Sequence, residues 1–154
     1  MEMIKTIGDS VLRGRSMIVE KIDQEILTII DTLESARKKA LGVGISAPQI
    51  GINKRIIIVG FTDNSRYPDQ EPIPIQVMIN PEYKSLSEEI EAGEEGCLSV
   101  PGKRGIVNRF VKIRYRFLNE HGNKVTAIAE DFKARIIQHE VDHLNGVLFI
   151  DKTL

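Results

Sequence analysis

The segment His139-Glu140-Val141-Asp142-His143, near the end of the chain, constrains the fold more than any other feature of the sequence. Residues four positions apart lie on one face of a helix, so a helix through this segment would let both imidazoles reach one cation. Glu140, next to the first histidine, would then be placed to act as a base on a water molecule. The segment therefore predicts a helix that carries a catalytic metal site.

Two histidines leave such a site one protein ligand short. Many zinc peptidases take the third ligand from well downstream of the second histidine, but here only residues 144–154 follow His143. The sequence has one cysteine, Cys97, in the run EEGCLS. A cysteine taken alone is more often a small buried hydrophobic residue than a ligand, but the adjacent glycine permits the close backbone approach that a reactive cysteine needs. We therefore predict a Cys/His/His site with an open position for water.

A second segment, GVGISAPQIG at 42–51, has three glycines and one proline in ten residues. This composition is typical of a loop whose backbone is exposed for pairing, and it carries a single amide side chain, Gln49. Gly42 is expected to end the preceding helix as its C-cap. No Lys-Ser or Lys-Thr pair follows, so the segment is not a phosphate-binding loop.

Three segments, GVGISAPQIG, EEGCLSVPG and QHEVDHLNG, occur in this order and together resemble the peptide deformylase family. The resemblance extends from about Ile4 to Asp151. It implies that the metal is held by the cysteine of the middle segment and the two histidines of the last: Cys97, His139 and His143. Cys/His ligation suits zinc equally well, so the expectation of Fe²⁺ as cofactor, with Zn²⁺, Ni²⁺ or Co²⁺ able to substitute, comes from the resemblance.

The resemblance also implies three catalytic roles. Glu140 would be the general acid and base. The side chain of Gln49 and the backbone N–H of Leu98 would stabilise the oxyanion that develops during the reaction.

Members of this family remove the formyl group from the N-terminal formyl-methionine of new polypeptides and release formate. The implied partner is therefore a nascent N-formylmethionyl peptide. Its backbone would pair as an added strand with Val43, Gly44 and Gly96. The methionine pocket would lie between the middle segment and the last helix, with the candidates Leu98, Phe132 and Ile136. Arg104 is assigned to the peptide, whereas Glu95 and Arg109 are placed behind the ligands or at the surface.

The composition favours one catalytic domain over residues 1–154. With 42% hydrophobic and 28% charged residues the chain can bury one core, and a second domain would be too small. A net charge of −1 predicts neither a nucleic-acid partner nor an anionic membrane, and no stretch approaches a membrane span. A single cysteine fits a reducing compartment. We expect the cytoplasm of a bacterial cell or of a phage-infected one.

Hydrophobic periodicity predicts an α+β fold. A helix is expected from Asp23, its N-cap, to Leu41, and the final helix would be capped by Asp131 and ended by Asn145-Gly146. Between them, strands are predicted at 56–59, 75–79, 111–117 and 124–129. His121 falls in the turn before the last strand and is expected to be solvated. The resemblance adds antiparallel sheets around a central metal-binding helix.

The sequence departs from the family pattern at three places. Ser46 stands where alanine is usual and Ile45 where leucine is usual, and both replacements are small. The sequence ends at Leu154, whereas bacterial relatives often continue into a helix that in some helps docking on the ribosome. Docking through such a helix is not expected here, and ribosome association should be weak and insensitive to salt.

Two alternative functions fit the sequence less well. A zinc peptidase of the His-Glu-x-x-His type lacks its downstream ligand here and would not use Cys97. A catalytically inactive metal-binding or peptide-binding module would need neither Glu140 nor Gln49. The sequence therefore favours an active deformylase.

Overall fold

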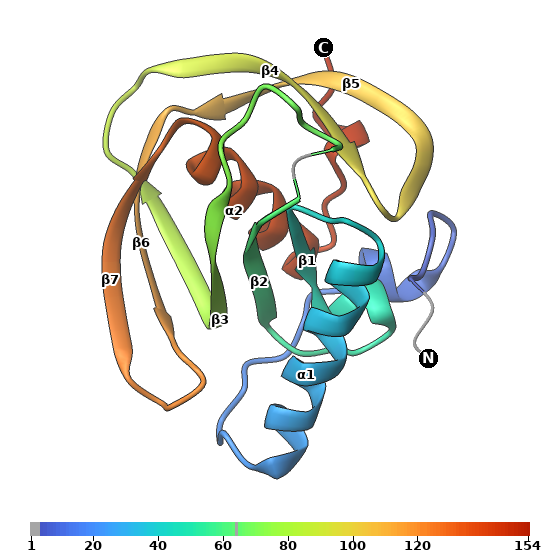
Figure 1. Ribbon diagram of the computed structural model, residues 1–154, viewed down its shortest axis with the longest axis vertical. Coiled ribbons are helices and arrows are strands. Elements are labelled where there is room, and N and C mark those ends of the chain that lie inside the picture. The colour runs from blue at the N-terminus through green and yellow to red at the C-terminus, as the bar shows by residue number, and fades with distance from the viewer. Residues whose placement is uncertain (1–3, 64) are drawn as a thin grey trace.

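Two antiparallel β-sheets make up most of the fold in the computed structural model, which describes residues 4–63 and 65–154 (Figure 1). The larger sheet has the strand order β1-β2-β3-β6-β7. Its strands are β1 (Gly44–Ser46), β2 (Ile56–Phe61), β3 (Ile73–Ser85), β6 (Lys112–Leu118) and β7 (Lys124–Glu130). The smaller sheet is the hairpin of β4 (Ile90–Cys97) and β5 (Val100–Phe110). The sequence predicts four strands of the larger sheet, but it misses β1 and the hairpin.

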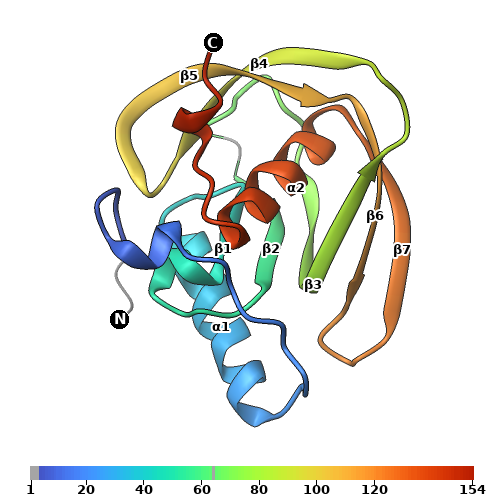
Figure 2. The same cartoon turned by 180° about the vertical axis from the view of Figure 1, so that it is seen from behind.

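Helix α2 (Asp131–Leu144) carries the two histidines and lies between the two sheets (Figures 1 and 2). From Ala134 to Leu144 every residue except Arg135 is buried. A helix buried on all sides usually has apolar residues all round, yet this one buries imidazole, carboxylate and amide groups. The predicted α+β fold with sheets around a central helix is confirmed, and the burial of polar side chains on α2 marks where the chemistry lies.

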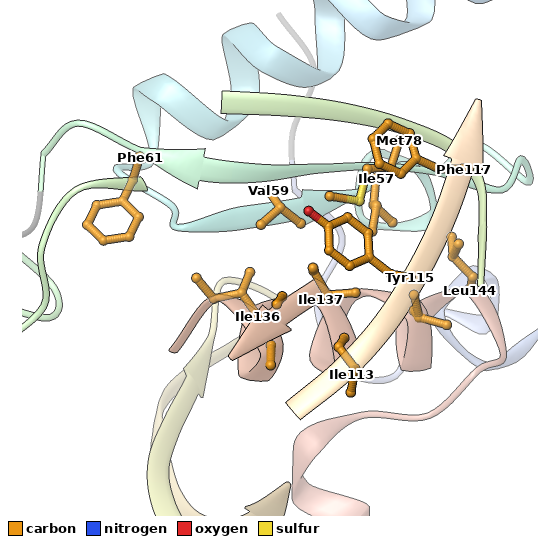
Figure 3. Packing of buried hydrophobic residues seen from close by; sticks show 13 residues of the cluster. Ile57, Val59, Phe61, Met78, Ile113, Tyr115, Phe117, Ile136, Ile137 and Leu144 are labelled. Carbon is orange, nitrogen blue, oxygen red and sulfur yellow. The ribbon is translucent and has the colours of Figure 1, made fainter. Parts of the chain in front are cut away.

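Apolar side chains of the larger sheet pack on α2. Figure 3 shows side chains of β2, β3 and β6 gathered over Ile136, Ile137 and Leu144. On β6 the buried residues alternate with exposed basic ones, as the sequence predicted. Each fully buried side chain of this size contributes roughly 1.5–3 kcal/mol. This core fixes the position of α2 relative to the sheet.

Helix α1 (Gln24–Lys39) covers the opposite face of β1 and β2. Strand β2 is therefore buried on both faces, with Ile56 and Ile58 facing α1 and Ile57 and Val59 facing α2. This explains its uninterrupted apolar run. At the start of α1, Asp23 is the N-cap as predicted, since its Oδ1 accepts a hydrogen bond from the N–H of Ile26 at 3.1 Å.

The predicted end of α1 is wrong in one detail. The residue in the left-handed conformation is Leu41, with φ of 58°, and not Gly42. The N–H groups of Leu41 and Gly42 bond the carbonyls of Lys38 and Arg37, which is the Schellman arrangement. These two bonds hold a leucine where a glycine is usual.

Three other local predictions differ from the structure. The segment 42–51 is not a loop throughout, because it contains β1 and the 3₁₀ helix η2 (Ala47–Ile50). Strand β3 continues through Asn80-Pro81, where Asn80 has φ of 52° and its side chain bonds the backbone of Val19. Asp131 does not cap α2: the N-cap is Glu130, and Asp131 has φ of 55° while its N–H bonds Val111.

The remaining short elements are η1 (Ser10–Arg13) and η3 (Phe149–Asp151). His121 is exposed in the turn between β6 and β7, as expected. Within the described residues, no helix has both the length and the apolar character needed to cross a membrane.

Candidate metal centre

The structure brings Cys97 next to two histidines that lie more than 40 residues further along the sequence. The ligand atoms of Cys97, His139 and His143 all lie within 4.8 Å of one another, and all three residues are buried. His139 and His143 lie one turn apart on α2, with ring centroids separated by 5.1 Å. Cys97 ends β4, and its Sγ lies 3.3 Å from Nε2 of His143. The hairpin thus delivers the sulfur to the face of α2 that carries both imidazoles.

The donor atoms suit a divalent metal ion. Burial raises the pKa of the Cys97 thiol, but the nearby His143 and His139 more than reverse this and hold it well below its usual range. Cys97 is therefore poised as a thiolate, the form in which cysteine binds metals. One thiolate and two imidazoles form a three-ligand set of catalytic type, which leaves a further position open. The residues present fit a bound metal.

A buried carboxylate orients the first histidine. Oε1 of Glu95 lies 2.9 Å from Nδ1 of His139, so Nε2 is the nitrogen of that ring that could bind a metal ion. Burial alone would raise the pKa of Glu95, but hydrogen bonds from His139 and Arg109 hold it well below its usual range. Arg109 binds both oxygens of Glu95 at 2.9 Å, and Arg135 binds Oε2 at 2.6 Å. The carboxylate is therefore ionised and held on three sides.

Arg109 also joins the hairpin to α2. Its Nη1 lies 2.6 Å from Oδ2 of Asp142, which lies on α2 between the two histidines. The sequence alone predicts Glu95 and Arg109 either behind the ligands or at the surface. Both are only 3% exposed, so neither is a surface residue.

Glu140 is the second carboxylate of the centre. It is buried and lines the cavity beside Cys97 and His139, and its Oε1 has no hydrogen-bond partner. Burial raises the pKa of this carboxyl. A buried, unpaired carboxylate oxygen is costly unless something binds there, and a water in the cavity would supply the partner.

Gln49 approaches the centre from η2. Its Nε2 donates to Ser99 Oγ at 3.1 Å and lies 3.7 Å from Cys97 Sγ. Its Oε1 accepts from both the N–H and the hydroxyl of Ser46, at 2.9 and 3.0 Å. The amide is thereby oriented with its NH₂ group toward the cysteine. The role of Ser46 was missed, although a serine three residues before a glutamine is a capping-box signal.

One cavity contains most of the predicted substrate contacts. Its walls include Glu140, Gln49 and Cys97 together with Val43, Gly44, Gly96, Leu98, Phe132 and Ile136. Arg104 is not among the lining residues; its guanidinium pairs with Glu94 and lies over the ring of Tyr67. Sequence reasoning missed Arg66, Tyr67 and Arg135, which also line the cavity. The first two lie in a polar connection without periodicity, so no local pattern indicated them.

A thiolate, two histidines on a buried helix and an unpaired glutamate together define a metal-dependent hydrolase. Comparison with known families identifies which one: residues 1–153 match the model of the polypeptide deformylase family, and the chain belongs to that family. Peptide deformylase 2 of Ralstonia nicotianae is 44% identical over 151 residues, covering 95% of this chain and 83% of that protein. A peptide deformylase of Halothermothrix orenii is 43% identical, covering 98% and 92%.

Solved structures agree with this assignment. A class I type b peptide deformylase from Acinetobacter baumannii, bound to Met-Ala-Ser, is 38% identical and superposes with a TM-score of 0.93, covering 99% of this chain and 98% of that one. A probable peptide deformylase from Synechococcus phage S-SSM7 is 39% identical with a TM-score of 0.88, covering 99% of each chain. The protein is a hydrolase that removes the formyl group from the N-terminus of newly made polypeptides.

Proposed function

We propose that Cys97, His139 and His143 hold the catalytic metal, and that the ion is Fe²⁺, with Zn²⁺, Ni²⁺ or Co²⁺ able to replace it. The convergence of three buried ligand atoms within 4.8 Å is the observation that carries this proposal. When bound, the metal would supply Lewis acidity and lower the pKa of water at the site. The choice of iron rests on the family resemblance.

Glu140 is the group that moves the proton. Its unpaired Oε1 in the cavity can take a proton from the attacking water. The same carboxyl then delivers that proton to the amine that leaves. The buried environment favours this exchange, because burial stabilises the protonated form that exists between the two steps.

Gln49 and the N–H of Leu98 stabilise the negative charge that develops on the formyl oxygen. Both residues line the cavity next to Cys97. The hydrogen bonds from Ser46 fix the Gln49 amide in advance, so it does not need to reorient during the reaction. Removing one such donor typically lowers kcat by about 10²–10³-fold.

The substrate backbone adds to the edge of the larger sheet. Strand β1 ends the strand order and pairs only with β2 among the described strands. Val43 and Gly44 lie at this edge and line the cavity. A Cβ atom at Gly44 would lie 2.8 Å from Oε2 of Glu140, so the absence of a side chain keeps the path to Glu140 open.

Leu98, Phe132 and Ile136 form the apolar part of the cavity and would take the methionine side chain. The Acinetobacter baumannii relative binds Met-Ala-Ser, a peptide that begins with methionine, and this supports the same product class here. Arg104 does not line the cavity, so a direct contact between Arg104 and the first residue of the peptide is not part of this proposal. The reaction would take place in the cytoplasm, on nascent chains.

The test is formate release from formyl-Met-Ala-Ser by protein purified without oxygen, before and after chelation and re-addition of Fe²⁺, Ni²⁺ or Zn²⁺. We expect activity to disappear with the metal and to return on re-addition. A parallel assay on an internal peptide bond should show no cleavage. Formate release that survives complete metal removal would overturn the proposal.

A further inference from the structure

Tyr67 lies in the connection between β2 and β3 and borders two neighbouring cavities. The first contains the metal centre. The second is lined by charged residues of both signs: Glu91, Glu94 and Asp131 together with Arg109 and Arg135. Tyr67 shares the wall between the two cavities with Phe132 and Arg135. None of the roles assigned above involves Tyr67.

The guanidinium carbon of the neighbouring Arg66 lies 6.0 Å from the Tyr67 ring centroid, and three further contacts hold the side chain, each from a different element. Its ring centroid lies 5.0 Å from that of Phe132 on α2. The guanidinium carbon of Arg104 on β5 lies 4.9 Å from the ring centroid, and Arg104 is itself held by Glu94. The backbone N–H of Gly96 on β4 donates a hydrogen bond to the Tyr67 hydroxyl at 3.2 Å. Arg104 therefore borders the site through the tyrosine and through its cross-strand neighbour Gly96, where a Cβ atom would lie 2.9 Å from Arg104 Nη1.

Two of these contacts involve positions that the substrate would use. Gly96 is a proposed backbone partner of the peptide, and its N–H is already engaged by the Tyr67 hydroxyl. Phe132 is a proposed wall of the methionine pocket, and the Tyr67 ring packs against it. An amide cannot serve two acceptors fully at once, so a peptide carbonyl that accepts from the Gly96 N–H has to displace the hydroxyl.

We propose that Tyr67 is a specificity-determining residue of this deformylase. Its ring closes the methionine pocket behind Phe132, and its hydroxyl holds the Gly96 N–H until a peptide carbonyl replaces it. This inference rests on the function proposed above. It predicts that removing the hydroxyl strengthens peptide binding, whereas removing the ring weakens it.

The test compares Tyr67→Phe and Tyr67→Ala with Tyr83→Phe, which removes a hydroxyl on β3 that lines neither cavity. Calorimetry would measure the Kd of Met-Ala-Ser with the metal-loaded enzyme. Kinetics would give kcat and KM separately for formyl-Met-Ala-Ser and formyl-Ala-Ala-Ser. Thermal melting of each variant would report whether the fold is retained.

Tyr67→Phe should tighten Met-Ala-Ser binding about threefold to tenfold. The reason is that the peptide no longer has to displace a hydrogen bond, whose net contribution is of this size. Tyr67→Ala should weaken binding and reduce the preference for methionine over alanine in kcat/KM by at least about tenfold, mostly through KM. Tyr83→Phe should match the parent.

Weaker or equal peptide binding by the Tyr67→Phe variant would overturn the role of the hydroxyl. An unchanged methionine preference in the Tyr67→Ala variant would overturn the role of the ring. Both results leave the proposed function standing if the parent releases formate. A parent that releases none would instead overturn the proposed function and, with it, this inference.

Discussion

Nδ1 of His139 lies 2.9 Å from Oε1 of Glu95, and both side chains are buried. Because Glu95 is held ionised, the imidazole donates from Nδ1 and keeps Nε2 for the metal centre. Arg109 and Arg135 bind the same carboxylate from β5 and α2. The orientation of His139, a proposed ligand, thus depends on three residues outside the proposed ligand set.

Glu95→Gln should weaken metal affinity about 10- to 100-fold, the usual effect of losing the partner of a metal-binding histidine. Competition with a chelator measures this affinity. Glu94→Gln is the matched control, since Glu94 is the preceding residue and its side chain is 57% exposed. Equal metal affinities for the two variants, with both folded by thermal melting, would show that Glu95 does not orient the ligand.

Gly44→Ala should lower kcat/KM at least about tenfold without unfolding the protein. The added Cβ would lie 2.8 Å from Oε2 of Glu140 and 2.9 Å from Ile136 Cγ2, so the base or the pocket wall must move. Gly14→Ala is the control, because a Cβ at Gly14 meets nothing within 4 Å. Steady-state kinetics on formyl-Met-Ala-Ser give the comparison, and parent-like activity of Gly44→Ala would refute the close approach.

Asp151 provides a pH-dependent contribution to stability. Its hydrogen bond from Arg13 lowers its pKa below the ordinary value of 3.8, so folding favours the ionised carboxylate. This stabilisation is fully present above the unfolded-state pKa and is lost as pH falls through the lower folded-state pKa. The parent should therefore melt above Asp151→Asn at pH 7, and the difference should shrink below about pH 4. The effect is small because both side chains are partly exposed. A difference in melting temperature that grows toward acid pH would contradict this sign.

Glu140→Gln should keep the metal and lose turnover by at least about a hundredfold. Glutamine preserves the side-chain volume but cannot accept the proton from water. Metal analysis together with kcat for formate release separates binding from chemistry. A kcat within a few-fold of the parent would mean that another group carries the proton.

Much of the fold could be predicted because its signals are local. The spacing of His139 and His143, the apolar period of α1 and the alternation on β6 lie within single elements. The hairpin of β4 and β5 was missed because glycines interrupt both strands and Ile90 and Ile106 are exposed, which hides the alternation.

Positions set by tertiary contacts could not be predicted. The sequence predicts that Asp131 caps the helix. In the structure Asp131 has a left-handed backbone conformation, and its N–H donates a hydrogen bond to the carbonyl of Val111. Glu95 and His139 are 44 residues apart, so no local pattern pairs them. Tyr67 lies in a polar connection, and its contacts with Gly96, Phe132 and Arg104 all reach elements that are distant in the sequence.

The metal content of Cys97→Ala, measured beside the parent and Glu140→Gln after identical anaerobic purification, tests the central assignment most directly. Removing the thiolate leaves two imidazoles, too few ligands to retain a divalent ion through chelation. We predict stoichiometric metal in the parent and in Glu140→Gln, and neither metal nor formate release in a folded Cys97→Ala variant. Stoichiometric metal in Cys97→Ala would contradict the assignment of Cys97 as a ligand.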